Sequence, residues 1–322
     1  MALLPFRRTG GEGMTATGID AGARGAARSG GAPTPVAAFL KGYSIEVMPR
    51  TAARVDDFRA ILPEASRVCI AHIDGTPIGE MVATARRLAA DGFQVMPHFP
   101  ARIIADRAEL GEWIARYRGE AGVRQGLILA GSPSRPRGPF ASAMDLLETG
   151  LFDGFERLHV AGHPEGNRDI DPDGGDENVM AALRWKTAFA ERTDATMALV
   201  TQFCFDAAPV IDWVNRLAGE GIALPVHVGI AGPARLQTLI RFAIACGVGP
   251  SLKVLQKRAM DVTRLVKPYE PTAIISALAA CKAANPAFNI EQVHFFPLGG
   301  IAATARWAIE HGGRYTRPAN AA

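Results

Sequence analysis

Polar side chains that can do chemistry stand at the ends of short apolar runs in this chain. Glu46 lies inside the run SIEV, His98 ends the run VMPH, and His163 follows RLHVAG. Burying a carboxylate at such a position is costly unless the group is paired or protonated. We therefore expect Glu46 to take part in acid–base chemistry rather than in packing.

Histidines end or interrupt several of the same runs. His98 and His163 stand beside prolines at run ends, where an imidazole can serve as a base or as a packed side chain. His159, His227 and His294 lie inside runs, where a hydrogen-bonded core histidine is the favoured interpretation. The first run has no HxH pair and the chain has no HExxH helix, so we predict no resident metal. A metal-dependent hydrolase remains an alternative.

The apolar runs also predict the fold. Between them lie segments with apolar residues at helical spacing, and alternating strands and helices are typical of a parallel sheet. Eight such strands close a barrel, so we expect an α/β fold, a (β/α)8 TIM barrel. Two extra helices, near 252–264 and 272–285, are predicted between strands seven and eight. The expected strands are 43–47, 68–73, 93–98, 126–131, 158–162, 197–202, 225–230 and 293–299, and the other expected helices are 78–90, 107–117, 143–149, 177–190, 210–218 and 235–246.

Composition narrows the function classes. The 322 residues are 48% hydrophobic with a net charge of +3, and no basic block interleaved with aromatics suggests nucleic-acid binding. No apolar stretch approaches the roughly 20 residues needed to span a bilayer. We expect a cytoplasmic protein with small-molecule partners, for which a homo-oligomer is compatible with the sequence.

The first residues differ from the rest. Residues 1–38 are rich in Gly, Ala, Arg, Ser and Thr and have no apolar periodicity, which predicts a disordered N-terminal extension, with an organellar transit peptide as the alternative. Residues 39–322 are expected to form a single catalytic barrel domain. The acid-rich segment 166–178 has no EF-hand spacing and is interpreted as a loop before an N-capped helix.

Active sites of such barrels gather at the C-terminal strand ends, and here these ends resemble a known family. The motifs SIEVMP, VMPHFPAR, LILAG, VAGHPEGN, TQFCF, PVHVGIAGP and VHFFPLGG occur in an order similar to that of the methylenetetrahydrofolate reductases, from about Tyr43 to Ile309. The resemblance implies FAD across the barrel mouth, NADH or NADPH as electron donor and a folate substrate. The reaction would form 5-methyltetrahydrofolate or run in reverse in one-carbon catabolism.

The resemblance also implies roles for individual residues. Glu46 would be the general acid that protonates the folate nitrogen. Thr201 and Gln202 would contact the pterin, and Leu236 stands where the family commonly has a folate-stacking Phe. The cofactor-binding residues implied in this way are His98, Ala130, Gly131, Ser132, His163, Glu165, Asn167 and Lys186, the last as a phosphate ligand.

The chain departs from the family after the fourth run. Ala130-Gly131-Ser132 replaces the family's Arg-Gly-Asp, which removes a cation and an anion from the flavin's surroundings, and Ala71 replaces a flavin-binding Thr. Arg135 and Arg137 could replace the lost positive charge. A non-catalytic folate-binding barrel therefore remains a second alternative.

Overall fold

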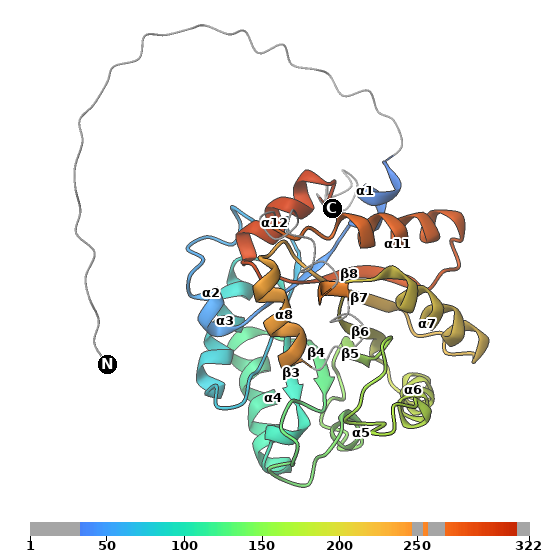
Figure 1. The fold of residues 1–322 in the computed structure, drawn as a ribbon. Helices are drawn as coiled ribbons and strands as arrows, with labels where there is room; N and C mark the ends of the chain where they lie inside the picture. Colours follow the sequence, from blue (N-terminus) through green and yellow to red (C-terminus); the bar gives the residue numbers. More distant parts are fainter. Residues whose placement is uncertain (1–32, 247–253, 257–267, 314–322) are drawn as a thin grey trace, which may run out of the picture. The chain divides into compact units, whose positions relative to one another are not determined.

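Eight parallel strands close into a barrel in the order β1 to β8 (Figure 1). The computed structural model describes residues 33–246, 254–256 and 268–313, all within one compact unit of residues 33–322. The predicted (β/α)8 TIM barrel is confirmed. Its strands are β1 (Ser44–Val47), β2 (Arg67–Ile70), β3 (Gln94–Pro100), β4 (Gln125–Leu129), β5 (Arg157–Gly162), β6 (Thr196–Cys204), β7 (Val226–Ala231) and β8 (Ile290–Phe296).

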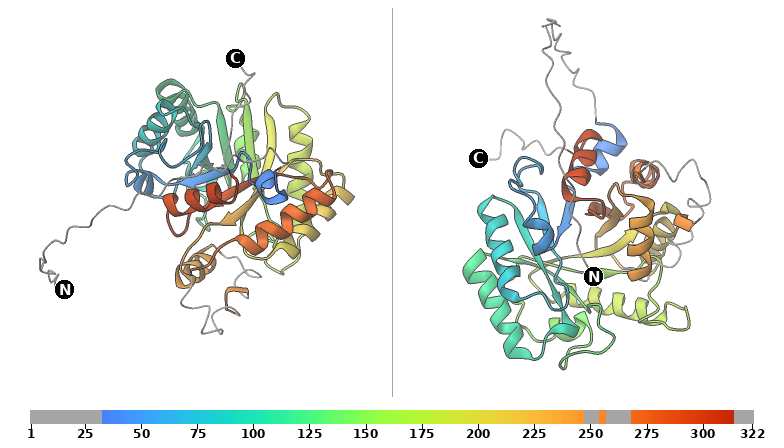
Figure 2. Two further views of the ribbon diagram at one scale, coloured as in Figure 1. Left: turned by 90° about the horizontal axis from the view of Figure 1, so that it is seen from above. Right: turned by 60° about the vertical axis from the view of Figure 1, so that its left-hand side comes forward.

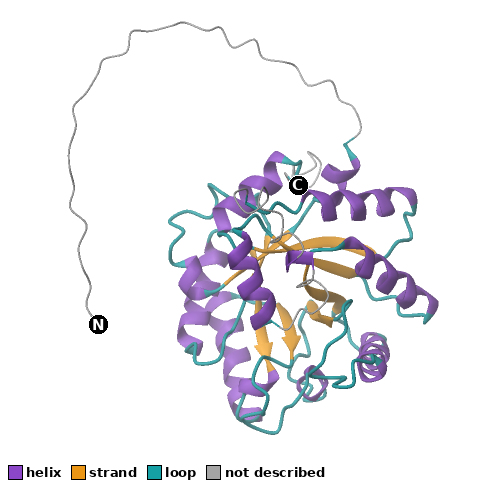
Figure 3. Cartoon of the chain, in the orientation of Figure 1, coloured by secondary structure: helices purple, strands orange, loops and turns teal. Residues whose placement is uncertain are grey.

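Helices surround this barrel on the outside (Figure 3), and Figure 2 shows the same arrangement from two further directions. Helix α1 packs against α11, and α3 packs against α4. The helices are α1 (Pro35–Phe39), α2 (Pro49–Ala52), α3 (Ile78–Ala90), the 3₁₀ helix η1 (Ala101–Ile103), α4 (Arg107–Ala121), α5 (Ala143–Leu147), α6 (Glu177–Ala190), α7 (Ala207–Gly219), α8 (Leu236–Ala245), α11 (Thr272–Ala284) and α12 (Ile301–Glu310).

Alternation along the strands separates two apolar regions. Ile45 and Val47 of β1 point outward into the main core between the barrel and its helices. A smaller cluster of Cys69, Met96, Leu127 and Val200 fills the barrel interior. Because successive strand side chains point to opposite faces, Ser44 and Glu46 face the interior, on the same side as this second cluster.

Local sequence sets the helix boundaries. The side chain of Asp106 accepts a hydrogen bond from the Glu109 backbone at 2.8 Å and begins α4. Gly122, with φ of 62°, ends that helix in the left-handed conformation that glycine adopts without strain. Such caps fix where each connection reaches the next strand.

Some boundaries differ from the predicted ones. β2 ends at Ile70, and the next residues turn away so that the His72 ring packs on Trp113 of α4. Helix α8 matches the predicted helix 235–246, and α11 confirms the predicted extra helix 272–285, whereas most of the other predicted extra helix, 252–264, lies outside the described residues.

Helix α1 includes residues 35–38, which the composition assigned to the N-terminal extension, and residues 1–32 lie outside the described part. Among the described residues, no helix is both long and apolar enough to cross a membrane.

Candidate functional site

Glu46 lies in the barrel between two imidazoles. Its Oε2 is 3.4 Å from Nε2 of His98 on β3 and 3.8 Å from Nε2 of His294 on β8. The Glu46 side chain keeps 19% of its exposure, while the two imidazoles are buried. A partly exposed carboxylate therefore lies against two buried imidazole rings, an arrangement suited to moving a proton.

His294 is held from its other side by Ser44. The Ser44 Oγ and the His294 Nδ1 are 2.9 Å apart, and the two residues are neighbours across the contact between β1 and β8. Burial alone would lower the pKa of His294, but the Cys69 and Glu46 side chains outweigh that cost and raise the pKa to about 9. The raised pKa favours the imidazolium form of His294 at neutral pH, and its Nε2 faces the Glu46 carboxylate at 3.8 Å, too far for a hydrogen bond.

His98 has the opposite electrostatic character. Burial lowers its pKa to about 4, and the nearby charge of Glu46 only partly offsets this effect. At neutral pH His98 is therefore neutral and can accept a hydrogen bond. Glu46 lies between one charged and one neutral imidazole.

The structure brings together Glu46 and His98, two residues predicted to belong to the site at separate strand ends, and adds two that sequence reasoning did not place there. His294 was interpreted as a core residue, yet it contacts the Glu46 carboxylate as well as Ser44. The two-residue period of a strand could have found Ser44, because Ser44 and Glu46 must share a face. The position of His294 needed the pairing register of β1 with β8, which the sequence does not show.

A second polar group lies at β5 and α6. Lys186 of α6 is buried, and its Nζ donates to the Ala161 carbonyl at 2.8 Å. Burial lowers the pKa of Lys186 to about 8. His163 lies nearby, with its Nδ1 3.4 Å from the Asn167 amide nitrogen, and burial together with the Lys186 charge lowers the pKa of His163 to about 4.

This second group brings together three of the residues implied to bind the cofactor, His163, Asn167 and Lys186. Among the described residues no carboxylate pairs with Lys186, so a buried ammonium here has only a carbonyl as its partner. Phosphate oxygens would neutralise such a group. Glu165 lies in the same turn, and its charge adds to the effect of burial in raising the pKa of Cys204.

The turn after β4 has a structural reason for its glycine. Gly131 has φ of 93°, and a Cβ there would lie 3.0 Å from the Pro100 ring. Ala130 accepts a hydrogen bond from the Arg102 backbone, and Ser132 is exposed. The Arg102 side chain stabilises this loop, because it donates hydrogen bonds to the Pro133 and Ala141 carbonyls, each at 3.0 Å. The glycine is therefore required by the turn, with or without a flavin above it.

The three residues implied to contact the substrate do not form one group in the structure. Thr201 is buried, donates to the Gln202 carbonyl and accepts from the Gly229 backbone, so its hydroxyl maintains the irregular contact of β6 with β7. Gln202 is half-buried, and its Oε1 accepts from the Phe203 backbone at 3.2 Å. Leu236 is buried in an apolar cluster with Phe203 and other residues, so its side chain contributes to packing.

The acid-rich segment 166–178 is a structured loop. Asp171 is buried, and its carboxylate accepts from the Asn178 and Val179 backbones, both at 3.0 Å. The predicted helix N-cap is therefore present, although Asp171 provides it in place of Asp176, the residue directly before α6. Asp169 pairs with Arg102 at 2.6 Å. These carboxylates stabilise the loop and the helix start.

Two further histidines lie inside the barrel. His227 Nε2 is 2.8 Å from a Glu291 carboxylate oxygen, as expected for a hydrogen-bonded core histidine. His159 packs edge-on against His227, with ring centroids 4.4 Å apart, but has no hydrogen-bond partner among the described residues. The expectation of a hydrogen-bonded His159 was therefore wrong.

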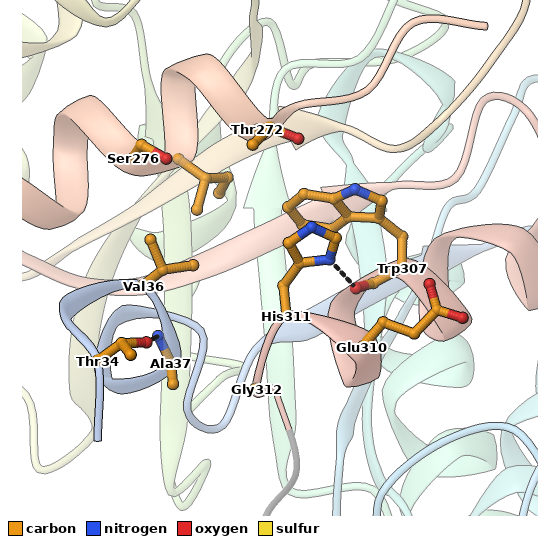
Figure 4. Close-up of a pocket in the computed structure, with 10 residues that line it drawn as sticks. Thr34, Val36, Ala37, Thr272, Ser276, Trp307, Glu310, His311 and Gly312 are labelled. Carbon is orange, nitrogen blue, oxygen red and sulfur yellow. Dashed lines mark hydrogen bonds between the residues drawn. The ribbon is translucent and has the colours of Figure 1, made fainter. Parts of the chain in front are cut away.

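Apart from these polar groups, the described residues also form a cavity among helices. A cavity of about 400 Å³ lies between α1, α11 and α12 (Figure 4), away from the strand ends. Its wall includes Trp307 and His311, whose rings stack 4.1 Å apart, and His311 Nδ1 donates to the Trp307 carbonyl. Within the described part of the chain, no three His, Cys, Asp or Glu side chains are arranged to hold a metal ion.

Comparison with known families adds no assignment, because no protein-family model matches this chain. The barrel fold by itself is compatible with many functions. A functional conclusion must therefore come from the site.

Proposed function

We propose that this chain is a flavin-dependent oxidoreductase of the methylenetetrahydrofolate reductase type. It would transfer a hydride from NADH or NADPH through FAD to 5,10-methylenetetrahydrofolate, or run the reverse oxidation. The observation that carries the proposal is the Glu46 carboxylate between His98 and His294, at 3.4 and 3.8 Å. Opening the folate's five-membered ring requires a proton at its nitrogen, and this group can supply one.

The protonated state of His294 favours this role for Glu46. Because its raised pKa keeps a proton on His294 at neutral pH, His294 is a proton donor whose Nε2 lies 3.8 Å from the Glu46 carboxylate. Ser44 fixes the His294 ring by its contact with Nδ1, which leaves Nε2 directed at Glu46. Delivery of the proton from the Glu46 carboxyl group to substrate would be followed by its replacement from His294.

The residues at β5 and α6 fit the cofactor. The Lys186 ammonium is buried with a carbonyl as its partner, which suits a phosphate of FAD, and His163 and Asn167 lie beside it. When bound, the flavin supplies the hydride. Ala130 and Ser132 carry no charge near this cofactor, so we expect its reduction potential to differ from that in relatives with Arg and Asp at these positions.

The first experiment is the absorption spectrum of the purified protein before and after addition of FAD. We expect a bound flavin that NADH or NADPH reduces. Lys186→Met should weaken FAD binding without unfolding the barrel, because methionine fills a similar volume. A colourless protein that takes up no FAD would overturn the flavin part of the proposal, and a protein that binds folate without flavin reduction would be a non-catalytic binder.

A second experiment isolates Glu46. Glu46→Gln should abolish transfer from reduced flavin to folate and leave the reduction of flavin by NADH nearly intact, because only the folate step needs the proton. Glu291→Gln is the matched control, since Glu291 also contacts a barrel histidine but lies away from Glu46. Equal loss of both half-reactions in Glu46→Gln would remove the acid role.

A further inference from the structure

Arg67 lies at the barrel opening opposite Glu46 and has an unusual set of partners. It is the first residue of β2, whereas Glu46 is near the end of β1. Its Nε donates to Gln125 Oε1 at 2.9 Å, its Nη1 to Gln292 Oε1 at 2.9 Å and its Nη2 to Gln94 Oε1 at 3.1 Å. All three acceptors are neutral, and none of the ion pairs among the described residues involves Arg67.

These bonds determine how the three glutamine amides are oriented. A guanidinium has five N–H donors and no acceptor, so three bonds leave two N–H groups of Arg67 unused. Each glutamine must turn its oxygen toward Arg67 and its NH₂ away from it. The Gln292 amide nitrogen lies 3.8 Å from where a Cβ of Gly42 would be. The polar groups directed away from Arg67 are therefore donors.

A cavity lies at this cluster. Its volume is about 160 Å³, and its wall includes Gly42, Ser66, Arg67, Gln94 and Gln292. A water molecule occupies about 30 Å³ of liquid, so the cavity has room for a small solvated ion and is too small for a folate or a dinucleotide.

The nearby charges leave the cluster positive. Burial lowers the pKa of Arg67, and the neighbouring Arg157 acts in the same direction, while Cys69 and Glu291 oppose them. Glu291 already binds His227 at 2.8 Å. Glu291 does not line the cavity, and the carboxylate on its wall is that of the exposed Glu64.

We propose that the pocket formed by Arg67, Gln94, Gln292 and Gly42 binds a small oxyanion such as phosphate or a carboxylate. The guanidinium supplies the charge, and the glutamine NH₂ groups supply additional donors. If Arg67 served only to close the barrel, its three glutamine bonds would suffice and the protein would not respond to anions. The site is separate from Glu46, and its test does not depend on folate chemistry.

The test is thermal unfolding of the full chain in inorganic phosphate and, separately, in acetate, with ionic strength held constant by sodium chloride. A ligand of the native state raises the melting temperature in proportion to the logarithm of its concentration once its sites are filled. We expect this rise with phosphate, acetate or both, and the comparison distinguishes a tetrahedral from a planar anion. A melting temperature that is independent of both anions would overturn the proposal.

Gln94→Glu is the decisive variant. Glutamate has the shape of glutamine and still accepts from Arg67, but it places a negative charge in the cavity, so anion affinity should fall about tenfold or more. Gln237→Glu, an exposed change on α8, is the control of equal charge. An identical anion response in both variants would overturn the site.

Two more variants test where the anion binds. Glu64→Gln removes the carboxylate from the cavity wall and should strengthen the response, so an unchanged response there would overturn the site even if Gln94→Glu fails to fold. Lys186→Met should keep the response, which separates this pocket from any phosphate held at β5 and α6. If Lys186→Met alone abolishes it, the anion binds at the other end of the barrel and the proposal fails.

Discussion

At the scale of single residues, the pKa of His294 is raised first by Cys69 and then by Glu46. Because Glu46 helps to hold the proton on His294, Glu46→Gln should lower the pKa of His294. NMR titration of the histidine ring signals measures this directly, with no substrate or cofactor present.

Glu291→Gln is again the control for this titration. It should leave His294 unchanged and alter the titration of His227, its own partner. An unchanged His294 titration in Glu46→Gln would show that the carboxylate does not influence the imidazole. That result would leave Glu46 without its proton source, whatever the substrate.

Residue types at strand ends allowed part of this site to be predicted. Glu46 was identified because a carboxylate inside an apolar run is costly, and His98 because it ends such a run. His294 was missed because its run resembles that of any core histidine. The role of Leu236 came from a resemblance alone, and its burial against Phe203 depends on packing that the motif does not show.

Among the secondary-structure elements, the irregular contact between β6 and β7 positions both Thr201 and Gln202. Gly229 lies where these strands are closest, and a Cβ there would collide with the Thr201 carbonyl oxygen and lie 2.6 Å from that of Gln202. Both obstacles are backbone atoms, which cannot rotate aside. The glycine therefore allows the close strand contact.

Gly229→Ala should destabilise the protein by about 1–3 kcal/mol or more, as overpacking does in a rigid core. Urea unfolding monitored by circular dichroism measures the change. Gly111→Ala in α4 is the control, because a Cβ there meets nothing within 4 Å and alanine favours the helix by up to about 1 kcal/mol. Equal effects of the two substitutions would contradict this explanation of the strand contact.

Element prediction succeeded where sequence signals are local. Helices α3 and α6 match the predicted ranges because apolar spacing and flanking stop or cap residues define them. β2 was predicted too long, since the apolar residues continue past Ile70 while the backbone turns so that His72 can pack on Trp113. That turn depends on a partner in α4, which local sequence does not specify.

For the whole molecule, the buried histidines predict how stability depends on pH. His98 and His163 have pKa values lowered to about 4, so unfolding takes up protons between that value and the ordinary histidine value of about 6.5, and stability falls as the pH drops through this window. His294 has a raised pKa, so its contribution is complete below about 6.5 and is lost as the pH rises to about 9.

We therefore expect the free energy of unfolding to be highest near neutral pH, to fall by about 1 kcal/mol or more toward pH 4 and to fall similarly as the pH rises from about 6.5 to 8. Above pH 8 the lowered pKa of Lys186 acts in the opposite direction and offsets part of the His294 effect. Urea titrations from acidic to alkaline pH test this profile. His98→Asn should make the acid-side fall shallower, because His163 still contributes, and should leave the alkaline side in place. A wild-type profile that is flat between pH 6.5 and 8, below the range in which Lys186 titrates, would show that His294 is not held in its charged form.

The barrel closes where its first and last strands meet, and the proposed proton pair lies across that seam. Ser44 and His294 are 250 positions apart in the chain, yet they share a hydrogen-bond contact. During synthesis on the ribosome, Glu46 leaves the exit tunnel long before His294 is made. A nascent chain can thus fold its early strand–helix units while still lacking any functional centre, and activity should appear only when the last strand is released and docks beside the first.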